Sequence, residues 1–192
     1  METVFKMLEK AAILKPFLKL ISEGKFFSKA FAILLLVVMI LSAVGFVYVF
    51  INSLGIFRVN VVMGIITELL VIVFFYILIN ILLVRAEDIN RLEESKDYIV
   101  IPVSVVLIKM IGEIMAALTV VFGIYITFAK LLGAGAMIRS FPGAPMIGGI
   151  LAQSGYWAFA AGIIAAFIVL VFFYLVAELA GVLVDIARNT RK

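Results

Sequence analysis

Four charged residues lie within long apolar stretches of the sequence, where charged side chains are costly to keep. They are Glu68, Lys109, Glu113 and Glu178. A charge near the centre of a membrane helix costs about 2.5–3.5 kcal/mol, so each should face protein, water or an opposite charge. Intramembrane carboxylates also mark proton relays and cation pathways. One interpretation is therefore a cation or proton path through the three glutamates, with Lys109 as a counter-ion.

The alternative interpretation of these charges is structural. Lys109 and Glu113 are one helical turn apart and can pair with each other, or with Glu178, to set the register of the helices. Lysine before glutamate is the weaker order for a pair within one helix, which favours partners on neighbouring helices. Glu68 would then be protonated or face a subunit interface. From the helical rise of about 1.5 Å per residue, we expect Glu68 and Glu113 at similar depths in the membrane.

Enzymatic chemistry has little support in the sequence. There is no His and no Cys, which excludes imidazole catalysis, thiolate metal sites, iron–sulfur clusters and disulfides. We find no phosphate-binding glycine loop, dinucleotide fingerprint, metal-ligand cluster or nucleophile elbow. Ser104 and Lys109 would point about 140° apart on one helix, which excludes a serine–lysine pair. We therefore expect a protein that is not an enzyme and binds no cofactor or metal.

The composition is that of a membrane protein. Of the 192 residues, 66% are hydrophobic and 15% charged, and the mean hydropathy is +1.30. Soluble domains are about 45–50% apolar and about 25% charged, so too few polar residues remain here to cover a soluble surface. The net charge of +4 predicts no nucleic-acid partner, because most basic residues lie at the ends of the apolar stretches.

Four apolar stretches are each long enough to cross about 30 Å of hydrocarbon as a helix. Continuous hydrophobicity favours helices over barrel strands, in which apolar and polar residues alternate. The stretches cover residues 30–50, 61–84, 98–132 and 156–186. The predicted fold is all-α: an integral membrane bundle of four transmembrane helices, built from two tandem helical hairpins and preceded by an amphipathic interfacial helix.

The amphipathic helix is predicted in residues 1–29, where apolar residues recur every three or four positions between lysines. It would lie on anionic lipid at the cytoplasmic face of the membrane, or pack on the ends of the bundle. Its lysines, which we expect at the membrane surface, are Lys6, Lys10, Lys15, Lys19, Lys25 and Lys29. Lys and Arg are also enriched in residues 85–97 and 188–192. The positive-inside rule therefore places both termini in the cytoplasm, with the protein in the plasma membrane.

Similarities between the two halves indicate a duplicated hairpin. Residues 28–34 resemble 95–101, and residues 74–80, which begin Phe-Phe-Tyr, resemble 172–178. Residues 30–97 would form the first hairpin with its cytoplasmic loop, and residues 98–192 the second. Chance similarity between apolar sequences is the alternative. The second hairpin contains a connection rich in Gly and Pro at 132–155, which is either an external loop or a re-entrant segment.

Small residues on the fourth predicted helix form a stripe typical of close helix packing. The stripe consists of Ala158, Gly162, Ala166, Ala177 and Gly181. These features predict a non-enzymatic membrane protein that acts as a structural or assembly subunit, in a homo-oligomer or in a larger complex with other membrane subunits. Two alternatives remain open: a small ion or proton channel or transporter that uses the intramembrane carboxylates, and a lipid-binding or membrane-shaping protein.

Overall fold

The structure is a computed structural model that describes residues 25–92, 100–134 and 155–190. These residues form helices, with no strand among them, as predicted. The long helices are α3 (Lys25–Ser53), α4 (Val61–Asn90), α5 (Val100–Leu131) and α7 (Ala158–Asn189); the short 3-10 helices η1 (Leu54–Arg58) and η4 (Gly155–Trp157) precede α4 and α7. The predicted interfacial helix up to residue 24, and most of the connection 132–155, lie outside the described residues.

All four long helices are long and apolar enough to cross a membrane. They contain 29 to 32 residues each, which makes them about 45 Å long at the usual helical rise and longer than the hydrocarbon core. The predicted all-helical class, with four helices that could span a membrane, is confirmed. Three of them, α3, α4 and α7, also extend past the predicted limits, and α4 continues six residues beyond the apolar stretch that ends at residue 84. α5 lies within its predicted stretch.

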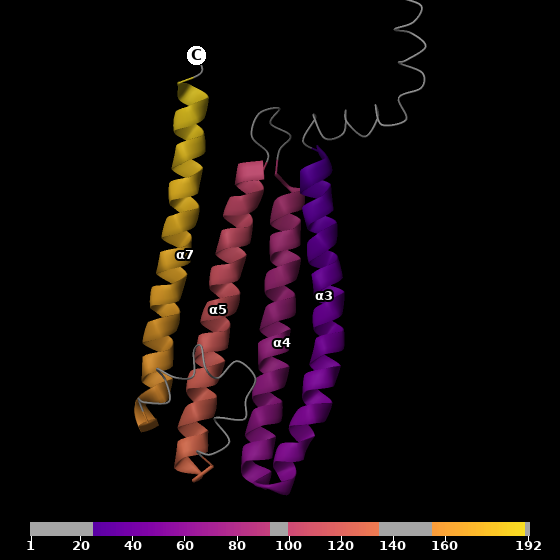
Figure 1. Ribbon diagram of the computed structural model, residues 1–192, viewed down its shortest axis with the longest axis vertical. Coiled ribbons are helices and arrows are strands. Elements are labelled where there is room, and N and C mark those ends of the chain that lie inside the picture. Colours follow the sequence, from indigo (N-terminus) through magenta and orange to yellow (C-terminus); the bar gives the residue numbers. More distant parts are fainter. Residues whose placement is uncertain (1–24, 93–99, 135–154, 191–192) are drawn as a thin grey trace, which may run out of the picture.

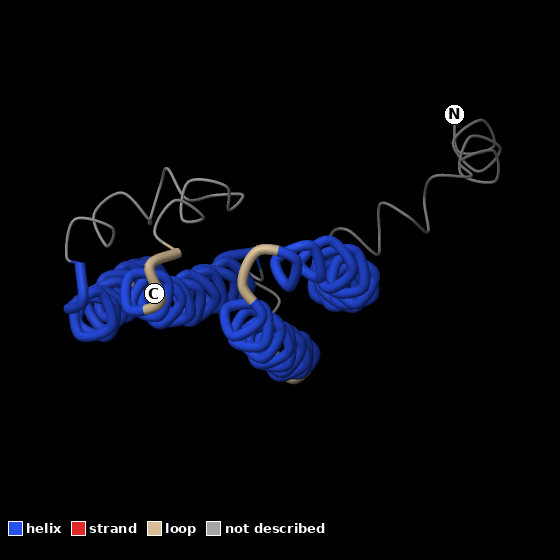
Figure 2. Tube along the Cα trace, turned by 90° about the horizontal axis from the view of Figure 1, so that it is seen from below, coloured by secondary structure: helices blue, strands red, loops and turns tan. Residues whose placement is uncertain are grey.

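The four helices lie side by side in chain order, α3, α4, α5 and α7 (Figure 1). The packing follows this order, because α7 packs against α5, α5 against α4, and α4 against α3. Seen along the helices, α4 stands to one side of the line formed by the other three (Figure 2). The arrangement is therefore more open than the predicted bundle, and α3 and α7, at its two edges, each have one main helical neighbour.

The connection between α3 and α4 is short and well defined. The side chain of Asn60 caps α4 by accepting a hydrogen bond from the backbone nitrogen of Met63, at 3.0 Å. The ring of Phe57 packs directly on Gly64, where a Cβ atom would lie only 2.7 Å from the ring. These contacts bring the end of α3 and the start of α4 together at one end of the molecule.

Two apolar clusters join the helices. The first lies near the α3–α4 connection and combines residues of α4, α5 and α7, namely Met63, Phe122, Tyr125, Ile126, Ala129 and Ala158. The second lies toward the opposite end and combines residues of α3, α4 and α5, namely Leu35, Leu82, Ala86, Ile89 and Val103. Both clusters contain residues of α4 and α5, so this pair connects the two edge helices.

Small residues bring α5 and α7 into close contact, as the predicted stripe requires. Gly162 of α7 faces Gly123 of α5, and a Cβ atom on either glycine would come within about 3.2 Å of the other's Cα. Ala158, Ala166 and Ala177 are buried. Gly181 differs from the other stripe residues, because a Cβ atom there would meet nothing within 4 Å. The close contact therefore ends before Gly181.

We predict that Gly123→Ala lowers the thermal stability of the protein. The new Cβ would lie 2.8 Å from the carbonyl oxygen of Ala158, and backbone cannot rotate away as a side chain can. Overpacking of this kind costs about 1–3 kcal/mol. The matched control is Gly181→Ala, which adds the same methyl group in open space on α7. Circular dichroism melting in detergent should show a lower Tm for Gly123→Ala alone; equal melting of both variants would contradict the close contact.

Candidate functional site

A cluster of polar side chains joins α4, α5 and α7. Arg85 of α4 donates two hydrogen bonds to Glu113 of α5: one from Nε to Oε2 at 3.0 Å, and one from Nη2 to Oε1. The hydroxyl of Tyr174 on α7 donates to Glu113 Oε1 at 2.5 Å and accepts from Arg85 Nη2 at 3.1 Å. Arg85 Nη1 also donates to Asp88 at 2.7 Å. We call Arg85, Asp88, Glu113 and Tyr174 the Arg85 cluster.

The geometry of the Arg85 cluster is that of a structural ion pair. The two parallel bonds between guanidinium and carboxylate form the strongest class of charge-assisted contact. The side chains of Arg85 and Glu113 are only 16% and 19% exposed, so water screens the pair little. Both oxygens of Glu113 already accept hydrogen bonds from Arg85, and Tyr174 adds a third. Glu113 is therefore compensated within the chain, which favours the register interpretation of this residue.

Lys109 contacts the same cluster from a different side. Its Nζ lies 5.2 Å from the centroid of the Tyr174 ring, a distance at which a cation is attracted to the face of the ring. The structure therefore brings Lys109 and Glu113 to the same tyrosine but does not pair them with each other. The contact joins Lys109 of α5 to Tyr174 of α7, in agreement with our expectation that the charged residues of this helix have partners on neighbouring helices.

Sequence reasoning misses Arg85, which is the actual partner of Glu113. The apolar stretch ends at residue 84, which places Arg85 in the loop that follows, whereas α4 continues to Asn90. The available signal is Asp88, three residues after Arg85, because a basic and an acidic residue at this spacing lie on one helical face. Tyr174 stands out in the sequence only as part of the repeated Phe-Phe-Tyr motif. Its counterpart Tyr76 is 69% exposed, so the two positions have different surroundings.

Glu68 lies in a separate environment near the α3–α4 connection. Its side chain is buried at 8% exposure, and its Oε1 accepts a hydrogen bond from Ser53 Oγ at 2.7 Å. Its other oxygen, Oε2, has no hydrogen-bond partner within the described residues. Glu68 and Arg85 are about 25 Å apart along the axis of α4. Because Arg85 binds Glu113, Glu68 and Glu113 do not lie at the similar depths that we expected.

Glu178 is different again, because it is exposed on α7. It lies one turn from Tyr174, yet no other described residue forms a hydrogen bond or ion pair with it. The three glutamates thus occupy three environments: Glu113 is paired, Glu68 is buried with one free oxygen, and Glu178 is exposed. The described residues do not connect them into the continuous path of the first interpretation.

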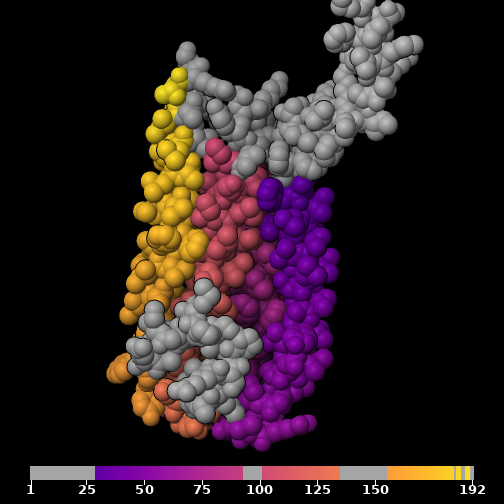
Figure 3. Space-filling view, viewed as in Figure 1, coloured from indigo at the N-terminus to yellow at the C-terminus, as the bar shows by residue number. Residues whose placement is uncertain are grey.

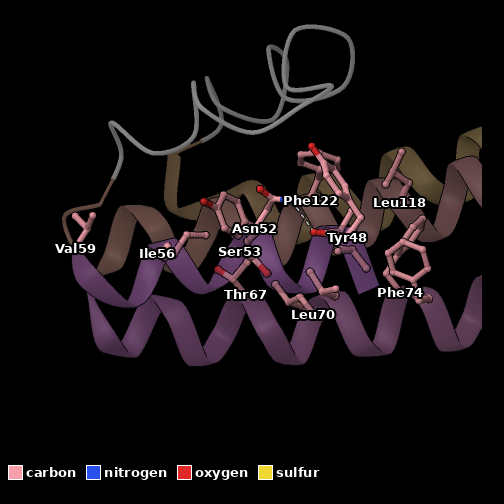
Figure 4. Close-up of a pocket in the computed structure, with 16 residues that line it drawn as sticks. Tyr48, Asn52, Ser53, Ile56, Val59, Thr67, Leu70, Phe74, Leu118 and Phe122 are labelled. Atoms are coloured by element: carbon pink, nitrogen blue, oxygen red, sulfur yellow. Dashed lines mark hydrogen bonds between the residues drawn. The ribbon is translucent and has the colours of Figure 1, made fainter. Parts of the chain in front are cut away.

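A cavity of about 650 Å³ opens between α3, η1, α4 and α5, near the α3–α4 connection (Figure 4). Most of its wall is apolar, and five aromatic rings contribute: Tyr48, Phe74, Phe75, Phe122 and Tyr125. Polar groups in the wall come from Asn52, Ser53 and Thr67. Sequence patterns do not indicate this cavity, because it depends on the position of α4 to one side of the line formed by α3, α5 and α7.

The predicted membrane-surface lysines fall mostly outside the described residues. Lys6, Lys10, Lys15 and Lys19 precede residue 25, and Lys25 is the first residue of α3. Lys29 is described, is exposed, and forms no ion pair with another described residue. It lies one turn inside the start of α3.

No protein-family model, curated protein or solved structure matches this chain.

We predict that Glu113→Gln destabilises the protein, because it leaves the Arg85 charge uncompensated between three helices. The expected cost is about 3 kcal/mol, at the lower end for a buried pair because both side chains keep some exposure. The double variant Arg85→Met with Glu113→Leu should recover most of this loss, since it removes both charges. Thermal unfolding in detergent measures both effects.

The matched control is Glu87→Gln, which removes the partner of an exposed pair on the same helix, Arg91 with Glu87. This variant should change the free energy of unfolding by less than about 1 kcal/mol. Equal Tm values for Glu113→Gln and Glu87→Gln would refute the structural role of the Arg85 cluster.

Proposed function

We propose that this chain is a non-enzymatic membrane subunit that assembles with further copies of itself through its two outer helices, α3 and α7. The observation that carries the proposal is the exposed carboxylate of Glu178 on an apolar face of a membrane-spanning helix. Its exposed neighbours on α7 are Leu175, Leu179 and Val182. A carboxylate costs up to about 2.5–3.5 kcal/mol in lipid, the value at the centre of a membrane helix, and a cation from another chain would offset that cost.

The outer helices are the available faces for assembly. α3 and α7 occupy opposite edges of the molecule (Figure 3). Each has a continuous exposed apolar face, which on α3 includes Ile33, Val37, Ile40 and Val44. Side chains of this size can face either lipid or another helix. The charge at Glu178 favours protein on that part of α7.

Lys29 of a second copy is a suitable cation for Glu178. Both α3 and α7 have one end at the side of the α3–α4 connection (Figure 1). Glu178 lies about 30 Å along α7 from Ala158, and Lys29 about 36 Å along α3 from Ser53. A lysine side chain can bridge the remaining difference. α7 of one copy beside α3 of the next would therefore place the two charges at similar heights.

This contact is head-to-tail, because it joins different faces of the two copies. A symmetric contact between two α7 helices would instead place Glu178 next to its own copy, and like charges repel. Head-to-tail contacts close into a ring when the rotation between copies permits it. In the proposed assembly α3–α4 and α5–α7 act as two helical hairpins. In this proposal the protein lies in the plasma membrane with both termini on the cytoplasmic side, because Lys and Arg are concentrated near both ends of the chain.

A channel or transporter that uses all three glutamates is less well supported. Glu113 accepts three hydrogen bonds from Arg85 and Tyr174, which leaves it little capacity to exchange a proton or a cation. The lipid-binding alternative depended on the lysine-rich segment, most of which lies outside the described residues. The subunit proposal rests on described side chains.

We predict that charge reversal at either residue weakens assembly and that combining the two reversals restores it. Glu178→Lys alone would face Lys29, and Lys29→Glu alone would face Glu178, so each should dissociate the complex at least about tenfold more readily. In the double variant the lysine at position 178 faces the glutamate at position 29, so the ion pair forms again with its charges exchanged. Multi-angle light scattering of the complex, extracted from membranes in mild detergent, measures the assembled mass.

The control for this experiment is Arg58→Glu, a reversal at an exposed residue of η1 near the α3–α4 connection. It should leave the assembled mass unchanged. A monomeric wild-type chain, or a double variant that stays dissociated, would overturn the head-to-tail contact. A wild-type complex with stoichiometric foreign chains would overturn the self-assembly proposed here.

A further inference from the structure

We propose that the cavity between α3, η1, α4 and α5 binds a lipophilic organic cation, with its apolar tail along the wall and its ammonium group against the aromatic rings beside Ser53. The ligand class follows from the size of the cavity, its aromatic lining and the buried carboxyl group behind Ser53. Neither Glu178 nor Lys29 belongs to the cavity, so this inference does not depend on the assembly proposed above.

The cavity has the dimensions of a binding site. Its volume of about 650 Å³ lies within the range of about 300–1,000 Å³ that small-molecule pockets usually have. The lining residues come from three helices and η1, with their side chains turned toward a common space (Figure 4). Tyr48, in the wall, is 71% exposed, so the cavity is open toward the outside of the helices. An amphiphile could therefore enter sideways from the membrane.

The aromatic rings favour a positive charge. Tyr48 and Phe74 extend from α3 and α4, and Phe122 and Tyr125 extend from α5. The face of an aromatic ring attracts an ammonium group by about 0.5–2 kcal/mol, with the larger values in sites that exclude water. The rings of Phe122 and Tyr125 are buried at 5% and 4% exposure, so Tyr48, which is 71% exposed, offers the most ring surface to an ammonium group. A neutral alkyl chain would fill the same space but would gain no such attraction.

The buried carboxyl group of Glu68 adds a second, independent attraction. Ser53 lines the cavity, and its Oγ lies 2.7 Å from Glu68 Oε1 and 2.9 Å from the backbone oxygen of Phe50. The hydroxyl has one proton, which we assign to the shorter contact with Glu68. A hydroxyl group has two acceptor lone pairs besides its single proton, so Ser53 Oγ can accept a hydrogen bond from an ammonium N–H in the cavity. The free Oε2 of Glu68 leaves the carboxyl group only partly satisfied by the described residues. A cation in the cavity would compensate it across Ser53.

Anions are disfavoured in the cavity for the same reason. Its lining includes no Lys or Arg among the described residues. Arg58 is nearby in sequence, between the lining residues Ile56 and Val59, but it is exposed and is not part of the wall. An anionic head group would face the Glu68 carboxyl group without a cation in the wall to balance it. The charge of the surroundings therefore selects a cation over an anion of equal size.

The test compares three probes with the same tail: dodecylammonium, dodecanol and dodecanoate. Native mass spectrometry of the full chain in a neutral detergent measures the occupancy of each probe. We expect dodecylammonium to bind at least about tenfold more tightly than the other two, which is the effect of combining a cation–π contact with a charge-assisted hydrogen bond. Equal binding of all three would show a groove for alkyl chains only and overturn the proposal, as would a preference for dodecanoate.

Two variants locate the selectivity. Glu68→Gln keeps the shape of the side chain and removes its charge, so the preference for dodecylammonium should fall severalfold. Ser53→Ala removes the acceptor at the wall and should lower the preference even if Glu68→Gln does not fold. The matched control is Glu87→Gln, which removes an exposed carboxylate of α4 outside the cavity and should leave the preference unchanged. Retention of the full preference by folded Glu68→Gln and Ser53→Ala would refute the proposed role of both residues.

Discussion

The ion pair between Arg85 and Glu113 sets the relative heights of the three helices α4, α5 and α7 in the described structure. It joins α4 to α5, and Tyr174 extends it to α7 through two hydrogen bonds. Lipid tails are as apolar as the helix faces, so the register of helices in a membrane depends on close van der Waals packing and on polar contacts between helices. A bidentate ion pair is specific to one relative height of two helices. It acts together with the close contact of Gly123 with Gly162, which brings α5 and α7 together.

A charge in lipid needs a partner, and the three intramembrane glutamates differ in whether the chain itself provides one. Glu113 has its partner on a neighbouring helix of the same chain, and Glu178 has none among the described residues. The open row explains this difference. Glu113 is on the central helix α5, between two neighbours, whereas Glu178 is on the edge helix α7, which packs mainly on α5. An uncompensated charge at an edge is a reason for a second chain to bind there.

The sequence was sufficient to predict what depends on local composition. Four apolar stretches of membrane length became four helices, and four of the five small residues in the predicted stripe are buried. The partner of Glu113 could not be predicted, because it depends on how far α4 extends past its apolar part and on its height relative to α5. The cavity could not be predicted either. It requires α4 to stand to one side of the line formed by α3, α5 and α7, and this position results from packing among several helices.

Glu68 and Glu113 show why burial alone does not assign a role to a membrane carboxylate. Both belong to helices that could span a membrane and both have little exposure, but from the described residues Glu113 accepts three hydrogen bonds and Glu68 accepts one. A fully compensated group stabilises the fold and has little affinity left for anything else. A carboxyl group with an unsatisfied buried oxygen has lost hydration without full compensation from the protein. A ligand that supplies the missing charge or hydrogen-bond donor can provide that compensation. The cavity beside Ser53 is where such a ligand has room to bind.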